Sequence, residues 1–110
     1  MIKNKQKKIQ LRDVLDVTDI IGRRWRGAIL ACLCDSEKRF NEIKKELHPI
    51  TSSILIKELK FLEENKLVIK NSTEEVTFYA LTEHGKSLDP LILKIVEWGQ
   101  KHRKIILENY

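Results

Sequence analysis

The segment KRFNEIKKELHPITSSILIKELKFLEENKLV, at residues 38–68, decides the fold that the sequence predicts. It contains two short amphipathic stretches separated by Pro49, which disfavours helix at the preceding residue. The first predicted helix begins near Asn41, a residue type that caps helix N-termini well, and it buries Ile43 and Leu47. Two short helices joined by a tight turn are typical of a helix-turn-helix.

The second helix of the segment is predicted to run from a cap at Thr51 to a stop at Asn65. Ile50 and Leu55 stand at the two positions of a hydrophobic staple, which fixes how the chain enters the helix. Because Asn tolerates the left-handed conformation that ends many helices, we expect Asn65 to provide the stop. The helical period places Leu55, Leu59 and Leu62 toward the core and Ser53, Lys57, Lys60 and Glu64 on the opposite side, with Ser52 and Ile56 beside them.

A β-hairpin is predicted directly after this helix. The runs Leu67–Lys70 and Val76–Leu81 have the composition of strands, and the residues NSTEE between them are typical of a hairpin tip. A helix-turn-helix followed by a hairpin is the layout of a winged helix-turn-helix. The predicted fold class is therefore mainly α with a small β-hairpin, a winged helix-turn-helix with further helices at its N- and C-terminal ends.

Helices are predicted on both sides of this unit. Apolar residues at helical spacing predict one helix over Leu11–Ile21 and another over Arg24–Cys34. A long C-terminal helix extends from about Glu83, and Pro90 either kinks it or marks a fresh start capped by Asp89.

The two outer helices are expected to be dimerisation helices. The apolar stripe of the C-terminal helix is longer than the core of a 110-residue chain needs, which favours a homodimer. The alternative is that this helix folds back on its own domain. The expected interface residues are Leu11, Val14, Leu15, Leu91, Ile95, Trp98, His102 and Ile105.

The composition is that of one globular domain with a basic surface. The chain is 42% hydrophobic and 34% charged, and 21 Lys and Arg against 16 Asp and Glu give a net charge of +5. We expect a basic flexible tail over residues 1–10 and a domain over residues 11–110. The basic excess favours a polyanion as partner. No apolar run reaches the length of a membrane span and no signal peptide is evident, so the cytoplasm is the expected location.

The outer face of the second helix suits a DNA groove. Thr51, Ser52 and Ser53 offer hydroxyl groups beside free backbone N–H groups at the helix N-terminus. Lys57 and Lys60 follow on the same side and complement the negative phosphates. The alternative for this face is an ordinary solvated helix surface, since Lys and Ser are common on surfaces.

Taken together, these motifs resemble the HxlR-type winged-helix transcriptional regulators. The resemblance runs through LDVTDIIGRRW, AILACL, KRFNEIKKEL, ITSSILIKELKFLEENKLV and FYALTEHGKSLDPLILKIVEWG, and RFNEI, YALTEHGKSLDP and EWG are its specific elements. It implies a homodimer that binds double-stranded operator DNA, with Thr51–Lys60 as recognition helix and the hairpin as wing. The DNA-binding residues expected on this basis are Thr51, Ser52, Ser53, Ile56, Lys57, Lys60, Lys70, Asn71 and Ser72.

The sequence departs from the family pattern at several places. Lys66 stands where the family usually has Gly, and Ser53 and Ile56 replace residues that are commonly basic and hydroxyl-bearing, respectively. The wing is short and carries Glu74 and Glu75 near its tip, which phosphates repel. We therefore expect the wing to contact DNA less strongly than the helix does.

Other chemistry has little support in the sequence. Cys32 lies at the edge of an apolar helix face, whereas Cys34 points away from it, so a sensing thiol at Cys34 is an alternative. His48, His84 and His102 are scattered and lack a second ligand at a motif spacing, so no metal site is expected. No motif points to a cofactor or to catalysis, and whether a small-molecule effector controls binding stays open.

Two other functions stay open at this point. A winged helix can instead dock another protein with the same surfaces, and it would then bind no duplex at all. An enzyme subunit that uses Cys34 is a weaker possibility, which thiol alkylation would test through loss of activity.

Overall fold

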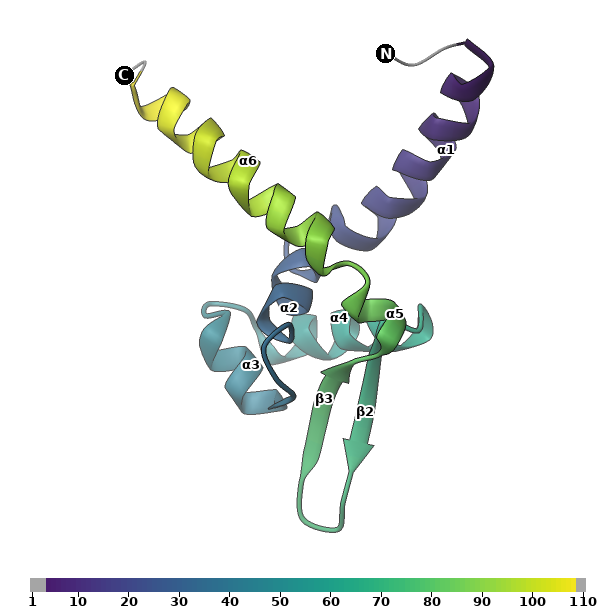
Figure 1. Ribbon diagram of the computed structural model, residues 1–110. Helices are drawn as coiled ribbons and strands as arrows, with labels where there is room; N and C mark the ends of the chain where they lie inside the picture. Colours follow the sequence, from purple (N-terminus) through teal and green to yellow (C-terminus); the bar gives the residue numbers. More distant parts are fainter. Residues whose placement is uncertain (1–3, 109–110) are drawn as a thin grey trace.

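The computed structural model describes residues 4–108. The elements are α1 (Asn4–Ile21), α2 (Arg26–Cys32), β1 (Lys38–Arg39), α3 (Phe40–Glu46), α4 (Ser52–Glu64), β2 (Val68–Ser72), β3 (Thr77–Leu81), α5 (Glu83–Lys86) and α6 (Asp89–Glu108). Figure 1 shows α1 and α6 rising from one end of the central helices and splaying apart like a V, while the β2–β3 hairpin projects from the other end. The winged helix-turn-helix that the sequence predicted is confirmed.

One hydrophobic core lies between α2, α3, α4 and the base of the sheet. The largest fully buried side chains are Ile29, Leu30, Ile43, Leu55, Leu59, Leu62 and Leu67. The predicted inner face of α4 is thus confirmed, because its three leucines are among these residues. The burial of this apolar area fixes α4 against the rest of the domain and leaves its other side free.

The entry to α4 has the predicted form. The Thr51 hydroxyl accepts a hydrogen bond from the backbone N–H of Ile54 at 3.3 Å, which confirms the cap. Ile50 and Leu55 are both buried, as a staple requires. In contrast, α3 begins at Phe40 rather than after a cap at Asn41. Its cap is Arg39, whose backbone N–H donates to the Glu42 carboxylate at 2.8 Å, so a reciprocal acidic side chain decides the start of the helix.

The end of α4 differs from the prediction. Asn65 keeps a φ of −89°, and Lys66 takes the left-handed conformation with a φ of 62°. The N–H of Lys66 donates to the Glu63 carbonyl at 3.0 Å, and the N–H of Leu67 donates to the Leu62 carbonyl at 3.0 Å. This is the Schellman arrangement, in which the position after the cap carries the positive φ. The expectation that Asn65 provides the left-handed stop was therefore wrong by one residue.

The sheet has three strands rather than the two of the predicted hairpin. Its order is β1-β3-β2, and both pairings are antiparallel. The two-residue strand β1 precedes α3 directly, with Lys38 opposite Tyr79. A strand of two residues has too few positions to show an alternating pattern, so the sequence did not reveal it.

A close backbone approach connects the wing to the helices beside it. The Thr82 hydroxyl donates to the Lys66 carbonyl at 2.7 Å and accepts from the Gly85 N–H at 2.9 Å. Gly85 lies so near the sheet that an added Cβ would come within 2.1 Å of the Leu67 carbonyl oxygen. Glycine is therefore required at this position by space.

The outer helices differ from the prediction at their ends. α1 begins at Asn4 rather than at Leu11, because Lys and Gln are good helix formers and neither Gly nor Pro interrupts the run. Residues 4–10 of the expected tail are thus assigned to α1, and the start of that tail, residues 1–3, lies outside the described residues. α2 is shorter than the predicted helix over residues 24–34. The C-terminal helix is interrupted, and α6 starts afresh at Asp89.

Candidate nucleic-acid interface

The outer face of α4 is open to solvent. Ser53, Lys57 and Lys60 are exposed, and the Ile56 side chain retains 58% of its accessible surface. Ser52 is half-buried at the first turn. Within the described part of the chain neither lysine takes part in an ion pair, so both ammonium groups are available to an external anion. The structure thus brings the predicted helical residues together on one accessible surface.

The wing presents a second group of polar side chains. Lys70, Asn71 and Ser72 are all exposed on β2. The Ser72 hydroxyl is 3.0 Å from the hydroxyl of Thr77 on β3, and the Lys70 ammonium lies 6.0 Å from the centre of the Tyr79 ring. These contacts hold two of the three predicted side chains against the hairpin, which leaves them less free than those on α4.

The wing tip is a tight, acidic turn. The Thr73 N–H donates to the Val76 carbonyl at 2.7 Å, and the Val76 N–H donates to the Thr73 hydroxyl at 3.1 Å. Glu74 and Glu75 lie between these residues and are exposed. Such a negative tip would be repelled by phosphates.

Sequence reasoning missed a buried ion pair on the inner side of α4. The Arg26 Nε atom lies 3.1 Å from one Glu58 carboxylate oxygen, and Nη2 donates to the other at 3.3 Å. Both side chains are over nine-tenths buried. The guanidinium also stacks 3.3 Å from the centre of the Phe61 ring. Glu58 follows Leu55 by three residues and precedes Leu62 by four, so it had to fall on the inner side of α4, and a charge there signals a partner.

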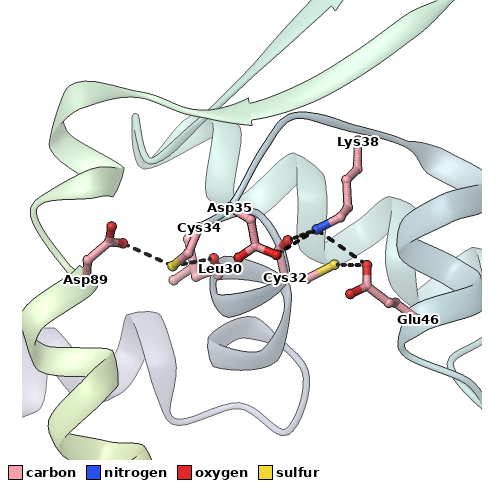
Figure 2. Close-up of polar contacts among 7 residues, drawn as sticks. All are labelled: Leu30, Cys32, Cys34, Asp35, Lys38, Glu46 and Asp89. Carbon is pink, nitrogen blue, oxygen red and sulfur yellow. Dashed lines mark hydrogen bonds and ion pairs between the residues drawn. The ribbon is translucent and has the colours of Figure 1, made fainter.

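Both thiols are held by carboxylates, as Figure 2 shows. Cys32 is buried, and its Sγ donates to Glu46 at 3.1 Å, while the Lys38 ammonium lies 3.5 Å from the same carboxylate. Burial, followed by this hydrogen bond, raises the pKa of the Cys32 thiol to about 12. The bond from Cys32 is also the main reason why the pKa of Glu46 is lowered. Cys32 is therefore a structural thiol, as its place in the sequence indicated.

The sequence predicted that Cys34 points away from the apolar helix face, and the structure differs from this prediction. Cys34 is half-buried, and its Sγ is 3.0 Å from a carboxylate oxygen of Asp89 and 3.3 Å from the Leu30 carbonyl (Figure 2). Burial and the bond to Asp89 raise the pKa of the Cys34 thiol to about 11. The fresh start of α6 at Asp89, which the sequence left as an alternative, brings this carboxylate to the thiol. A reactive thiolate at Cys34 is disfavoured as a result.

The side chains predicted for dimerisation lie on α1 and α6. Leu11, Val14 and Leu15 are more than half exposed, and so are Trp98 and Ile105, while Leu91 and Ile95 retain about two fifths or more of their surface. His102 is exposed and stacks on Trp98, with 4.8 Å between the ring centres. The Cα radius of gyration is 16.3 Å, whereas a compact domain of this length has about 13 Å. The two helices thus carry apolar surface that their own chain does not cover.

Two further findings concern metal binding and membrane-spanning helices. Within residues 4–108, no group of three His, Cys, Asp or Glu side chains is placed so that it would hold a metal ion. None of the helices in that range is sufficiently long and apolar to traverse a lipid bilayer.

Comparisons with known proteins agree with this geometry. A family profile described as HxlR-like helix-turn-helix matches residues 20–106. The chain is 36% identical to the HTH-type transcriptional regulator YybR of Bacillus subtilis, over 84% of this chain and 75% of that one. Against YdeP of the same organism the identity is 39%, over 77% and 69% of the two chains.

Solved structures show the same similarity. The redox regulator HypR in its reduced form superposes with a TM-score of 0.81 and 34% identity, over 89% of this chain and 99% of that one. The quinone-bound form of YodB from B. subtilis superposes with a TM-score of 0.73 and 30% identity, over 82% and 98% of the two chains.

Proposed function

The chain belongs to the HxlR-like helix-turn-helix family of transcriptional regulators, which are not enzymes, and we propose that it binds a double-stranded DNA operator as a homodimer. The observation that carries this proposal is the exposed face of α4, where Lys57 and Lys60 lie free of ion pairs among the described residues. Because the proposed partner is operator DNA, the cytoplasm is the proposed location.

The contacts to DNA divide between the helix and the wing. We assign phosphate or base contacts to Thr51, Ser52, Ser53, Ile56, Lys57 and Lys60 on the helix and to Lys70, Asn71 and Ser72 on the wing. The hydroxyl-bearing N-terminus of α4 offers free backbone N–H groups to phosphates. The lysines further along neutralise the backbone or read base edges in the major groove.

The homodimer explains the uncovered apolar surface. Trp98 is 66% exposed and Leu15 is 63% exposed, and such large apolar patches on a chain of this size mark an interaction surface. A second copy of the chain offers the same α1 and α6 surfaces in a two-fold arrangement. Leu11, Val14, Leu15, Leu91, Ile95, Trp98, His102 and Ile105 are the interface residues of this proposal.

A two-fold dimer also sets the form of the operator. Two copies of α4 enter two major grooves, so the site is a pseudo-palindrome with half-site centres about 10 bp apart or at a multiple of that distance. Inserting half a helical turn between the half-sites places one groove on the opposite side of the duplex. The paired-groove arrangement therefore requires that this insertion abolish tight binding by the dimer.

The thiols have a structural part in this proposal. One similar structure is described as a redox regulator and another as quinone-bound. Here both thiols donate to carboxylates and have raised pKa values, so we do not propose that Cys32 or Cys34 controls DNA binding.

The decisive experiment is a mobility-shift titration at several salt concentrations, with duplexes that the protein itself selects from a random pool. Lys57→Ala and Lys60→Ala should each weaken binding and reduce the salt slope by about one if the lysine contacts a phosphate. Lys86→Ala, a change of an exposed lysine on α5 whose ammonium lies 3.6 Å from the Glu83 carboxylate, is the control and should change neither quantity.

Two outcomes separate this proposal from its alternatives. A protein that selects no duplex, and shifts none at low salt, is a protein-docking winged helix instead. Replacing both Glu74 and Glu75 by Gln should leave the affinity unchanged or raise it, because the change removes charges that repel phosphate. A large loss of affinity from that change would assign the wing tip a direct role.

A further inference from the structure

The buried guanidinium of Arg26 contacts two helices that have different tasks in the proposed function. Its Nη1 atom donates to the Asp19 carbonyl, near the end of α1, at 2.6 Å. Its other nitrogens face the Glu58 carboxylate of α4 at 3.1 and 3.3 Å, and its plane lies on the Phe61 ring of α4. One side chain, itself the first residue of α2, thus bonds to the end of the outer helix and to the recognition helix.

The chemistry of arginine suits such a connection better than that of lysine. A guanidinium is a planar fork with five donors, so it can bond a carboxylate along one edge and a carbonyl along another. Its faces remain free to stack on an aromatic ring. Arg26 donates from Nη2 to Glu58, with Nε 3.1 Å from the second carboxylate oxygen, and from Nη1 to the Asp19 carbonyl. Its face lies on the Phe61 ring. A lysine ammonium has neither the second edge nor the face.

We propose that Arg26 and Glu58 are positioning residues that fix the orientation of the recognition helix α4 relative to the dimerisation helix α1. The inference rests on the proposed function, in which α1 belongs to the dimer interface and α4 enters the DNA groove. In that dimer the separation of the two recognition helices depends on how firmly each α4 is held against its own α1. The ion pair therefore sets which half-site spacing the dimer accepts.

The cost of a buried ion pair supports a positioning role over a stabilising one. Removing two charges from water is expensive, and apolar side chains of similar volume often serve stability equally well. Arg26 and Glu58 are only 7% and 6% exposed, so they bear this desolvation cost nearly in full. What an apolar pair cannot supply is a directed bond to the Asp19 carbonyl.

The test uses a double variant that replaces the pair without leaving a charge unpaired. Arg26→Met with Glu58→Leu fills the space with apolar side chains that are good helix formers, so the variant should unfold at the wild-type urea concentration or above it. Lys38→Met with Glu46→Gln is the matched control, because it breaks another ion pair that contacts neither α1 nor α4.

The first measurement requires neither DNA nor a particular oligomeric state of the protein. Spin labels at Arg12→Cys on α1 and Glu64→Cys on α4 report the distance between the helices within one chain, when labelled protein is diluted with unlabelled protein. Both positions are exposed, and mass spectrometry confirms that Cys32 and Cys34 remain unlabelled. The distance distribution should broaden in the Arg26–Glu58 double variant and stay narrow in the control. An unchanged distribution would overturn the proposal.

The second measurement addresses the function. One duplex carries the two selected half-sites at the selected spacing, and two others have one base pair inserted or deleted between the half-sites. A fourth duplex carries a single half-site. Wild-type protein should bind the selected spacing about tenfold or more tightly than the altered spacings. For the double variant this ratio of affinities should fall to about twofold or less, because the ion pair that preorganises α1 and α4 is gone. Affinity for the single half-site should be unchanged, which a general loss of structure would not allow.

The outcomes are distinguishable from failure of the proposed function. If wild-type protein selects no duplex, the proposed function fails, and the broadening of the label distance still decides whether Arg26 and Glu58 hold α4 to α1. If the distance distribution broadens but the spacing preference persists, the pair does not determine operator spacing and that part of the inference is wrong.

Discussion

Replacing Lys66 by Gly should stabilise the protein. Lys66 is exposed and has a φ of 62°, a conformation that costs an L-residue about 1–2 kcal/mol because Cβ approaches the following carbonyl oxygen. Glycine removes this cost but gains about 0.5–1 kcal/mol of conformational freedom in the unfolded chain. The expected net gain in the free energy of unfolding is therefore about 0.5–1 kcal/mol.

The substitution changes only the conformational contributions to the free energy of unfolding, because every backbone hydrogen bond at the site stays in place. The Lys66 N–H continues to donate to Glu63, and its carbonyl continues to accept from the Thr82 hydroxyl. Urea unfolding followed by circular dichroism, at one fixed protein concentration, measures the gain as a shift of the midpoint with an unchanged slope. The melting temperature should rise by about 2–6 °C.

The matched control is Lys60→Gly, the same change at an exposed position inside α4. There the backbone is helical, so glycine should cost about 0.5–1 kcal/mol. If Lys66→Gly destabilises the protein as much as this control does, the left-handed stop at Lys66 is not present in solution and the account of the end of α4 is wrong.

Three further predictions concern the proposed interface, the Cys34 thiol and the close packing of α5. Trp98→Ala should weaken the free energy of dimerisation by about 2 kcal/mol or more, because it removes an aromatic anchor, and a light-scattering dilution series measures this change. An unchanged dimerisation constant would mean that the interface lies elsewhere. Cys34 should react with a maleimide near pH 8 about 100-fold more slowly than a free thiol does. The reason is that a thiol pKa raised from 9.0 to about 11 lowers the thiolate fraction by that factor. A rate equal to that of a small thiol would contradict the bond from Cys34 to Asp89. Gly85→Ala should lower the free energy of unfolding, measured by urea denaturation, by about 1–3 kcal/mol, because its Cβ would meet backbone atoms. A variant as stable as wild type would refute the close approach.

The sequence predicted best those features that depend on periodicity. The inner face of α4 requires only that apolar residues recur with the helical period, and its leucines are buried as expected. The cap at Thr51 and the staple beside it were also predictable, because both are local patterns of residue type. These are the features that position the proposed recognition surface.

Features that depend on several segments at once were predicted less well. Asn65 and Lys66 are both adjacent to the end of α4, and only the bond from Leu67 back to Leu62 decides which of them takes the positive φ. A local preference of Asn for that conformation was outweighed by the packing of Leu67 in the core. The family pattern, with Gly at the position of Lys66, pointed to the correct residue.

The Arg26–Glu58 pair was missed for a related reason. The charge of Glu58 on the inner side of α4 was visible in the sequence, but its partner lies 32 residues earlier, at the start of another helix. No local spacing rule connects two such positions. The bond between Cys34 and Asp89 is more distant still, because it joins residues 55 apart.

The uncovered apolar sides of α1 and α6 imply that regulation by this protein depends on its concentration in the cell. With dimerisation as proposed, the competent species forms in proportion to the square of the free monomer at low abundance, by mass action. Operator occupancy then rises more steeply than linearly with expression. A small change in synthesis or turnover of the chain would thus cross a threshold in the transcription of its target, with no ligand needed to sharpen the response.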